Sequence, residues 1–77
     1  MIELTLFTTE GCHLCEQAHE ILLCVADNHP LDIRLQEIGD DDQLVARYGV
    51  RIPVVRFPNN DELDWPFSHA DIEKFLA

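Results

Sequence analysis

The chain has 77 residues, of which 15 are acidic and 5 are Lys or Arg, so that its formal net charge is −10. A chain of this length forms one domain, and residues 1–77 are expected to share one hydrophobic core. Its negative surface repels phosphate backbones and anionic lipid headgroups, which argues against nucleic acid and membranes as partners. No apolar run approaches the roughly 20 residues that a membrane-spanning helix needs.

The beginning of the chain and its cysteine count indicate a compartment. The first residues, MIELTLF, favour a strand over a secretory signal, because they lack a basic opening and a small-residue cleavage site. The three cysteines are an odd number, which is typical of a reducing compartment and not of a fully disulfide-bonded secreted protein. We therefore expect a cytoplasmic location.

The first third of the chain has a strand pattern followed by a helix pattern. Residues 2–7 alternate between apolar and polar side chains, apart from Phe7, and this period of two predicts a half-buried strand. Apolar residues then recur at helical spacing from position 14 to about position 26, and residues 27–30 end the helix. The expected buried face of this helix consists of Leu14, Ala18, Ile21, Leu22 and Val25.

A second strand and a short helix follow. Residues 31–38 alternate again and predict a strand. The side chains expected on one face of this strand are Leu31, Ile33 and Leu35. Gly39 and the three aspartates at positions 40–42 supply a turn and an N-cap ahead of a short helix that Gly49 closes.

The last third of the chain predicts a hairpin and a terminal helix. Residues 54–57 are rich in β-branched side chains, residues 58–61 form a turn, and residues 62–65 are a plausible return strand. Ser68 and Asp71 resemble a capping box, with Asp in place of the usual Glu, at the start of the terminal helix.

The predicted order of elements is β-α-β-α-β-β-α. A strand-helix-strand unit crosses over right-handed and pairs its strands in parallel, whereas the tight turn makes the last two strands antiparallel. We therefore predict an α/β domain in which a four-stranded mixed sheet is flanked by three helices.

Cys12 and Cys15 stand where the first strand gives way to the first helix, and three chemistries fit them. They can form a redox couple, because the N–H donors at a helix N-terminus favour a thiolate at Cys12. They can belong to a zinc site with His19, although such a site needs a fourth ligand. They can also be two small buried side chains, an interpretation that Gly11 disfavours because it places the pair in a loop. Cys24, which has apolar neighbours, is expected to pack in the core.

The motif Cys12-His13-Leu14-Cys15 between strand and helix, together with Ile52-Pro53 before the third strand, resembles the thioredoxin fold in its minimal, glutaredoxin-like form. The resemblance extends over the whole chain. It implies that Cys12 is the nucleophile, that Cys15 resolves the mixed disulfide, and that Pro53 is cis and lies beside the motif. The other residues expected to contact the substrate are Gly11, His13, Leu14, Arg51 and Ile52.

Two departures from the glutaredoxin pattern bear on the substrate. Thr9 stands where glutaredoxins carry a lysine, and residues 65–68 stand where they carry Gly-Gly and an acidic pair. Both family features bind glutathione, so their loss argues against glutathione as the substrate. Arg51 is the one residue that could replace the lysine, and the backbone N–H and C=O of Ile52 are expected to be available to pair with a substrate.

The sequence thus favours a thiol–disulfide oxidoreductase, expected to act as a monomer on protein or small-molecule disulfides. Its electrons are expected to come from a reductase or from glutathione, and no bound cofactor or metal is expected. The alternative, from another class, is a thioredoxin-fold binding module in which the cysteine pair is incidental or holds a metal.

Overall fold

The computed structural model describes residues 2–76, and these residues form the predicted order of elements. The elements are β1 (Ile2–Thr8), α1 (His13–Ala26), β2 (Leu31–Glu37), α2 (Asp42–Tyr48), β3 (Val54–Arg56), β4 (Glu62–Asp64) and α3 (His69–Leu76). The last three strands each end one residue earlier than predicted. No helix within residues 2–76 is both long enough and apolar enough to cross a membrane.

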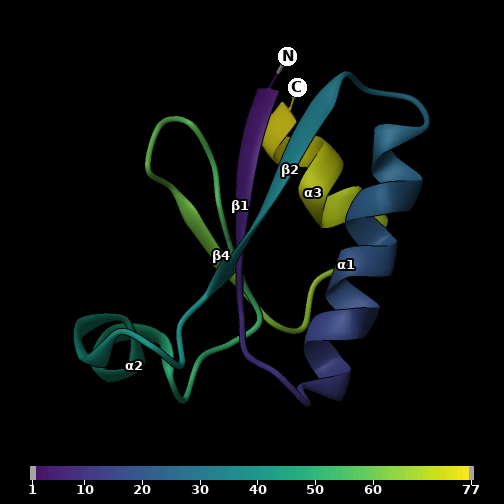
Figure 1. Ribbon diagram of the computed structural model, residues 1–77. Helices are drawn as coiled ribbons and strands as arrows, with labels where there is room; N and C mark the ends of the chain where they lie inside the picture. The colour runs from purple at the N-terminus through teal and green to yellow at the C-terminus, as the bar shows by residue number, and fades with distance from the viewer. Residues whose placement is uncertain (1, 77) are drawn as a thin grey trace.

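The four strands form one mixed sheet in the order β2-β1-β3-β4 (Figure 1). β1 and β2 are parallel, with Ile2 opposite Leu31 and Thr8 opposite Glu37. β3 is antiparallel to β1, and β4 is antiparallel to β3. The predicted α/β fold is therefore confirmed, with β1 and β3 in the centre of the sheet.

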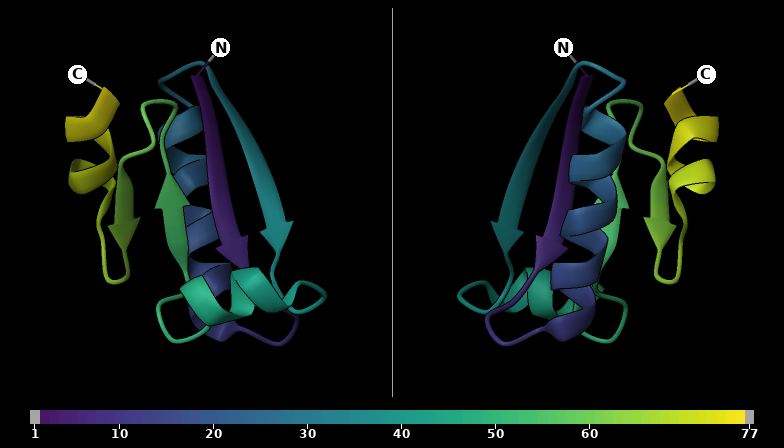
Figure 2. Two further views of the ribbon diagram at one scale, coloured as in Figure 1. Left: turned by 90° about the vertical axis from the view of Figure 1, so that its left-hand side faces the viewer. Right: turned by 90° about the vertical axis from the view of Figure 1, so that its right-hand side faces the viewer.

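The larger part of the hydrophobic core lies between the sheet and the pair of helices α1 and α3, which lie on one side of the sheet (Figure 2). Alternate residues of β1 face these helices, because successive side chains of a strand point to opposite faces. The buried members of this cluster are Leu4, Leu6, Ala18, Leu22, Val25, Leu31, Val55, Phe57, Phe67 and Ile72.

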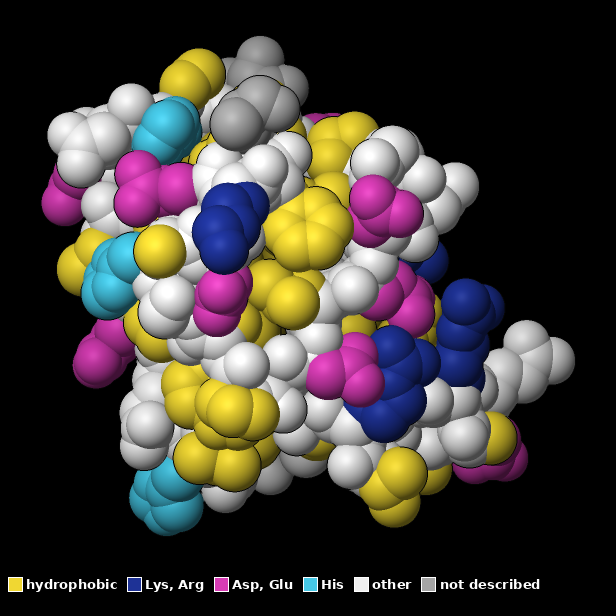
Figure 3. Space-filling model, turned by 180° about the vertical axis from the view of Figure 1, so that it is seen from behind, with side chains coloured by type: hydrophobic (Ala, Val, Ile, Leu, Met, Phe, Trp, Pro, Cys, Tyr) yellow, Lys and Arg dark blue, Asp and Glu magenta, His cyan; other side chains and the backbone are white. Residues whose placement is uncertain are grey.

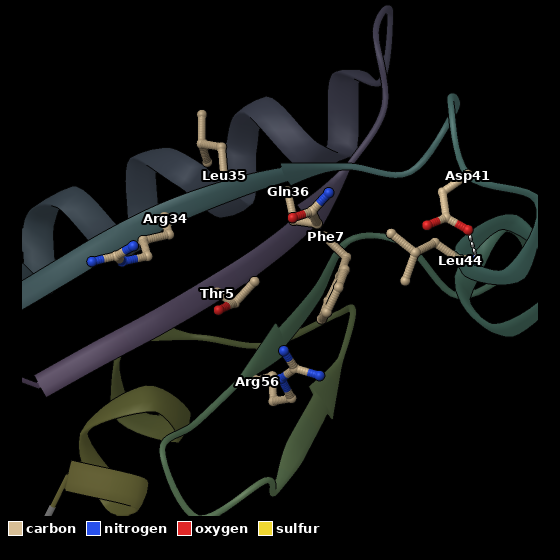
Figure 4. A pocket seen from close by; sticks show the side chains of 8 residues that line it. All are labelled: Thr5, Phe7, Arg34, Leu35, Gln36, Asp41, Leu44 and Arg56. Carbon is tan, nitrogen blue, oxygen red and sulfur yellow. Dashed lines mark hydrogen bonds between the residues drawn. The ribbon is translucent and has the colours of Figure 1, made fainter.

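A smaller cluster lies on the opposite face, where α2 covers one end of the sheet. The rings of Phe7 and Tyr48 stack with their centroids 4.0 Å apart. The guanidinium of Arg56 lies over the Phe7 ring, 5.2 Å from its centroid. A shallow cavity of about 310 Å³ remains beside this stack (Figure 4). Its lining residues are Thr5, Phe7, Arg34, Leu35, Gln36, Asp41, Leu44 and Arg56.

The two shorter helices begin at the caps that the sequence predicts. The Asp41 carboxylate accepts hydrogen bonds from the backbone N–H groups of Gln43 and Leu44 at the start of α2. The backbone N–H of Ser68 donates to the Asp71 carboxylate, and the N–H of Asp71 donates to the Ser68 hydroxyl, which confirms the capping box. Both caps satisfy N–H groups that a helix leaves unpaired in its first turn.

Leu14 and Cys24, which the sequence predicts to be buried, are exposed, and so is Leu35 of β2. Leu14 is 45% exposed, because in the first turn of α1 the residue that faces the core is Cys15 and Leu14 lies at the rim of the buried face. Leu35 is 54% exposed, because β2 is an edge strand. The prediction that Cys24 packs in the core is wrong: Cys24 is exposed, since two residues after Leu22 a helix presents its opposite side.

Leu22 and its neighbour Leu23 provide a matched test of the core. Leu22 is fully buried, whereas Leu23 is 50% exposed. We expect Leu22→Ala to lower the free energy of unfolding by about 2–5 kcal/mol, because it removes apolar contacts and leaves a cavity. Leu23→Ala should change it by less than about 0.5 kcal/mol. Urea denaturation followed by circular dichroism would measure both, and equal losses would contradict the orientation of α1.

Candidate active site

Cys12 is the N-cap of α1, and its backbone is extended where the helical residues begin. The backbone N–H of Cys15 donates a hydrogen bond to the Cys12 Sγ at 3.1 Å. The side chain of Cys12 therefore occupies the position in which an N-cap oxygen usually satisfies an unpaired N–H of the first turn. Such a donor, together with the positive end of the helix dipole, stabilises negative charge on sulfur.

The loop that presents Cys12 turns at Gly11. Gly11 has φ +80°, a left-handed conformation that side chains other than glycine rarely adopt, although a Cβ at this position would meet no neighbouring atom. The N–H of Cys12 donates to the carbonyl of Thr9 at 3.3 Å and closes the turn. Gly11 thus serves the backbone conformation of the loop and not the packing of a side chain.

The two cysteines differ in exposure and are joined. They form a disulfide, with their Cα atoms 5.2 Å apart. Cys15 is only 3% exposed, whereas Cys12 is half-buried. A thiol that approaches from solvent therefore reaches the sulfur of Cys12 first. This asymmetry is what a nucleophilic cysteine and a protected resolving cysteine need.

The segment before β3 reaches the same end of the sheet as the cysteine loop. Phe7 is opposite Val54 in the antiparallel register of β1 and β3, so Pro53 lies beside the end of β1, where the loop begins. The Ile52–Pro53 peptide bond is cis. The N–H of Trp65 donates to the Pro53 carbonyl and ties this segment to the end of β4.

The prediction that the Ile52 backbone is free on both sides is wrong for its N–H group. This N–H donates to the carbonyl of Tyr48 at 3.0 Å, because the chain leaves α2 in a tight turn before it reaches Pro53. A substrate that pairs here as a strand has the carbonyl of Ile52 as its acceptor and lacks the matching donor.

Arg51 is held by carboxylates of β4. Its guanidinium lies 2.8 Å from the Asp64 carboxylate and 3.0 Å from the Glu62 carboxylate. These contacts hold the pKa of Asp64 below its usual range. The hydroxyl of Tyr48 also donates to Glu62, and this hydrogen bond, followed by Arg51, lowers the pKa of Glu62. Arg51 therefore braces α2 and the segment before Pro53 against β4, and its charge is already matched by two carboxylates.

The remaining residues predicted in the site lie on the exposed first turn of α1. His13 is solvent-exposed, with its Nδ1 3.6 Å from the Glu16 carboxylate. The exposed Leu14 follows it, and Figure 3 shows hydrophobic side chains gathered at the end of the molecule where α1 begins. Within residues 2–76, no three His, Cys, Asp or Glu side chains come together as metal ligands.

Glu37 is a residue that the sequence analysis missed. Its carboxylate accepts hydrogen bonds from the backbone N–H of Glu10 at 3.0 Å and from that of Gly39 at 2.6 Å. Glu10 is two residues before Cys12, so the end of β2 holds the loop that carries Cys12. An acidic residue at the end of a strand is a weak signal in a sequence with 15 acidic residues.

Comparison with known proteins agrees with this geometry. Thioredoxin 1 from Thermosipho africanus has the same fold, with a TM-score of 0.68, although it is only 19% identical over 96% of this chain and 93% of its own. The protein described here is thus of the thioredoxin-fold class. The chain belongs to the glutaredoxin-like domain family (DUF836), whose model matches residues 3–77.

Two solved structures are more similar in sequence. XcR50 from X. campestris is 41% identical, with a TM-score of 0.82 in its crystal structure, over 95% of this chain and 93% of its own. Ne2328 from Nitrosomonas europaea is 26% identical, with a TM-score of 0.85, over 99% of this chain and 92% of its own. No curated protein matches the chain.

The contact between Glu37 and the cysteine loop can be tested by titration. The hydrogen bonds from Gly39, Thr9 and Glu10 hold the pKa of Glu37 below its usual value of 4.5. A carboxyl with a lowered pKa keeps its bonds above that pKa and loses them as the pH falls through it. We expect the amide proton resonances of Glu10 and Gly39 to titrate together, with a midpoint below 4.5.

NMR spectra recorded as a function of pH would make this measurement. In Glu37→Gln the shared titration should disappear, whereas in Glu20→Gln, which changes an exposed acid of α1, it should persist unchanged. A shared midpoint at or above the usual value for Glu would contradict the anchoring role of Glu37.

Proposed function

We propose that this protein is a thiol–disulfide oxidoreductase that uses Cys12 and Cys15 as a dithiol–disulfide couple. The observation that carries the proposal is the contrast between the two sulfurs at the start of α1. Cys12 is partly exposed and its Sγ accepts the N–H of Cys15, whereas Cys15 is buried. A binding module with an incidental cysteine pair has no need of this arrangement.

The proposed reaction proceeds by two thiol–disulfide exchanges. The Cys12 thiolate attacks one sulfur of a substrate disulfide, forms a mixed disulfide and releases the other substrate sulfur as a thiolate. The Cys15 thiolate, once its proton has passed to solvent, attacks the Cys12 sulfur, which forms the Cys12–Cys15 disulfide and releases the second substrate thiol. The substrate thereby gains two electrons, and an external dithiol donor returns the couple to its reduced form.

The surface around Cys12 favours an extended protein segment as substrate. Gly11 and His13 flank the nucleophile, and Leu14 offers an exposed apolar side chain one residue further on. Ile52 and Pro53 lie at the same end of the sheet and offer the Ile52 carbonyl as an acceptor. Arg51 contributes to this surface by bracing it, because two carboxylates already engage its charge.

The proposal also covers the cofactor, the electron donor, the location and the oligomeric state of the protein. The couple needs no bound cofactor, and its electron donor is a reductase or another protein dithiol, with glutathione as a slower donor. A net charge of −10 suits a soluble protein of the cytoplasm that meets neither nucleic acid nor membranes. One chain carries the complete couple, so a monomer is sufficient for the reaction.

Cysteine variants test the two roles. In reduced protein near neutral pH, we expect iodoacetamide to modify Cys12 faster than Cys15, because Cys12 is accessible and sits at the helix N-terminus. Cys15→Ser should accumulate a mixed disulfide with a protein substrate, and Cys12→Ser should reduce disulfides no faster than the uncatalysed exchange. Mass spectrometry of the trapped complex and an insulin-reduction assay would measure these outcomes.

Cys24→Ser is the matched control, because Cys24 is exposed on α1 and takes no part in the Cys12–Cys15 disulfide. Its activity should equal that of the wild type, and mild oxidation should still join Cys12 to Cys15. Faster alkylation of Cys15, or a mixed disulfide carried by Cys24, would overturn the assignment of roles.

The departures from the glutaredoxin pattern predict slow reduction by glutathione. Thr9 lacks the charge-assisted hydrogen bond of the family's lysine, a bond worth about 1.5–3 kcal/mol, which corresponds to roughly 10- to 100-fold in affinity. We expect a protein dithiol donor to reduce the oxidised couple faster than millimolar glutathione does. Stopped-flow measurement of the fluorescence of Trp65, the single tryptophan, would follow both reactions if the signal responds to oxidation.

Arg51→Ala tests whether Arg51 only braces the segment before Pro53 or binds glutathione in place of the family's lysine. Because Asp64 and Glu62 engage Arg51, we expect the variant to leave the ratio of the two rates unchanged after correction for lost stability. Rapid reduction by glutathione that collapses in Arg51→Ala would show that Arg51 has taken over the role of the lysine and that this prediction is wrong.

A further inference from the structure

β2 is the long open edge of the sheet. It has seven residues, whereas the strand at the other edge, β4, has three. Figure 2 shows β2 with β1 on one side and no strand on the other. Such an edge presents a row of N–H and C=O groups that can pair with another strand.

The hydrogen bonds to β1 identify which backbone groups of β2 face the open side. The N–H of Ile2 donates to the carbonyl of Pro30, and the N–H of Ile38 donates to the carbonyl of Thr8. The even-numbered residues of this segment therefore point their backbone groups toward β1, because the direction alternates along a strand. The backbone groups on the open side belong to Leu31, Ile33, Leu35 and Glu37.

The carbonyl of Glu37 already accepts a hydrogen bond from the side chain of Gln36. The segment that is ready to pair is therefore residues 31–35. Its side chains divide by face: Leu31, Ile33 and Leu35 lie on the side of α1, and Asp32 and Arg34 lie on the other side, as the register with β1 requires. In Figure 4, Leu35 lies on the α1 side of β2, away from Arg34 and Gln36.

We propose that two copies of this chain pair through this edge and form a continuous eight-stranded sheet. The two β2 strands run antiparallel about a two-fold axis at Ile33. Leu31 then lies opposite Leu35 of the second copy, and Asp32 lies opposite Arg34 of the second copy. Ile33 and the two flanking leucines exchange backbone hydrogen bonds with their counterparts, because these are the residues whose groups face outward.

Charge selects this register. Since the outward groups belong to odd-numbered residues, the axis passes through a residue, and the candidates are 32, 33 and 34. An axis at Asp32 sets two aspartates opposite each other, and an axis at Arg34 sets two arginines opposite each other, whereas an axis at Ile33 forms two Asp–Arg pairs. These pairs occupy the closely spaced positions of the antiparallel ladder, where opposite side chains interact most. Within its own chain Arg34 already lies 2.9 Å from the Glu3 carboxylate and 3.3 Å from the Asp32 carboxylate, so each arginine of the dimer shares its charge between these carboxylates and Asp32 of the second copy.

Exposed apolar side chains lie along the same edge. Leu35 is 54% exposed on the α1 side of β2, and it would cover Leu31 of the second copy. Leu23, which is 50% exposed, lies on the flank of α1 away from Cys24 and Ile21, which face Trp65 and His69. This flank borders β2, so the two α1 helices would bring their Leu23 side chains toward the new seam.

The proposed dimer is weak and reversible. A pairing of five residues on each chain is a small interface, and two chains of charge −10 repel each other until salt screens them. The inference revises the expectation of a monomer, and it does not rest on the proposed redox function. The cysteine loops follow the far ends of the β1 strands and remain open, so a dimer could form whether or not the couple is active.

Sedimentation equilibrium of the reduced protein at physiological ionic strength tests the proposal, from micromolar to millimolar concentrations. We expect the average mass of the wild type to rise from that of one chain toward that of two. Asp32→Arg and Arg34→Asp each replace both Asp–Arg pairs by like-charge pairs, and each should weaken association at least about 10-fold. The double variant D32R/R34D restores opposite charges and should associate like the wild type.

A mixture of the two single variants gives the most specific test. D32R has arginine at positions 32 and 34 and R34D has aspartate at both, so the two chains should form a mixed dimer with opposite charges at every pair. Amide exchange keeps the test decisive if a variant folds poorly: in the wild type, protection of the Ile33 and Leu35 N–H groups should increase with concentration. A wild type that stays monomeric throughout, or single variants that associate as well as the wild type, would overturn the proposal.

Discussion

The hydrogen bond from the backbone N–H of Cys15 to the Cys12 Sγ is the interaction on which the candidate active site depends. It makes the proposed nucleophile, Cys12, the cap of its own helix, so that one sulfur atom satisfies an unpaired donor and can be stabilised as a thiolate. The rest of the site positions this cap. β1 delivers the loop, Gly11 turns it, and Cys15 and Ala18 anchor the helix to the core.

The cysteine loop and the segment before Pro53 are each held by groups that take no part in the proposed exchange. At the loop, Glu37 at the end of β2 accepts the N–H of Glu10. At the other segment, Tyr48 and Arg51 bind Glu62 and fix the chain that leads into Pro53. Both supports use carboxylates, which shows that the large acidic excess of this chain includes structural members as well as a solvated surface.

The residues that depart from the glutaredoxin pattern have structural roles in this protein. The position of the family's lysine is taken by Thr9, whose side chain contributes with Gly39 to the environment that lowers the pKa of Glu37. The Gly-Gly segment is replaced by Trp65 and its neighbours, and the Trp65 ring packs edge-on against the buried Phe67. Thr9 and residues 65–68 thus serve loop anchoring and packing where glutaredoxins carry a cation and an open backbone, which agrees with the proposed preference for a protein dithiol donor.

The sequence alone determined the order of elements, the mixed sheet, the capping box of α3 and the position of the cysteine pair. These features depend on local periodicity, turn residues and caps, which act over a few neighbouring residues. Tertiary structure decided the rest. Leu35 and Cys24 are residue types that are often buried, and they are exposed here because β2 is an edge strand and because of the rotation of α1 about its axis.

Three contacts of the candidate site join residues between 4 and 27 positions apart. Ile52 donates its N–H to Tyr48, Arg51 pairs with two carboxylates of β4, and Glu37 accepts the N–H of Glu10. The partners of Arg51 and Glu37 follow from how the strands are placed in space, and the bond from Ile52 to Tyr48 follows from the turn that leaves α2; no local pattern in the sequence specifies them.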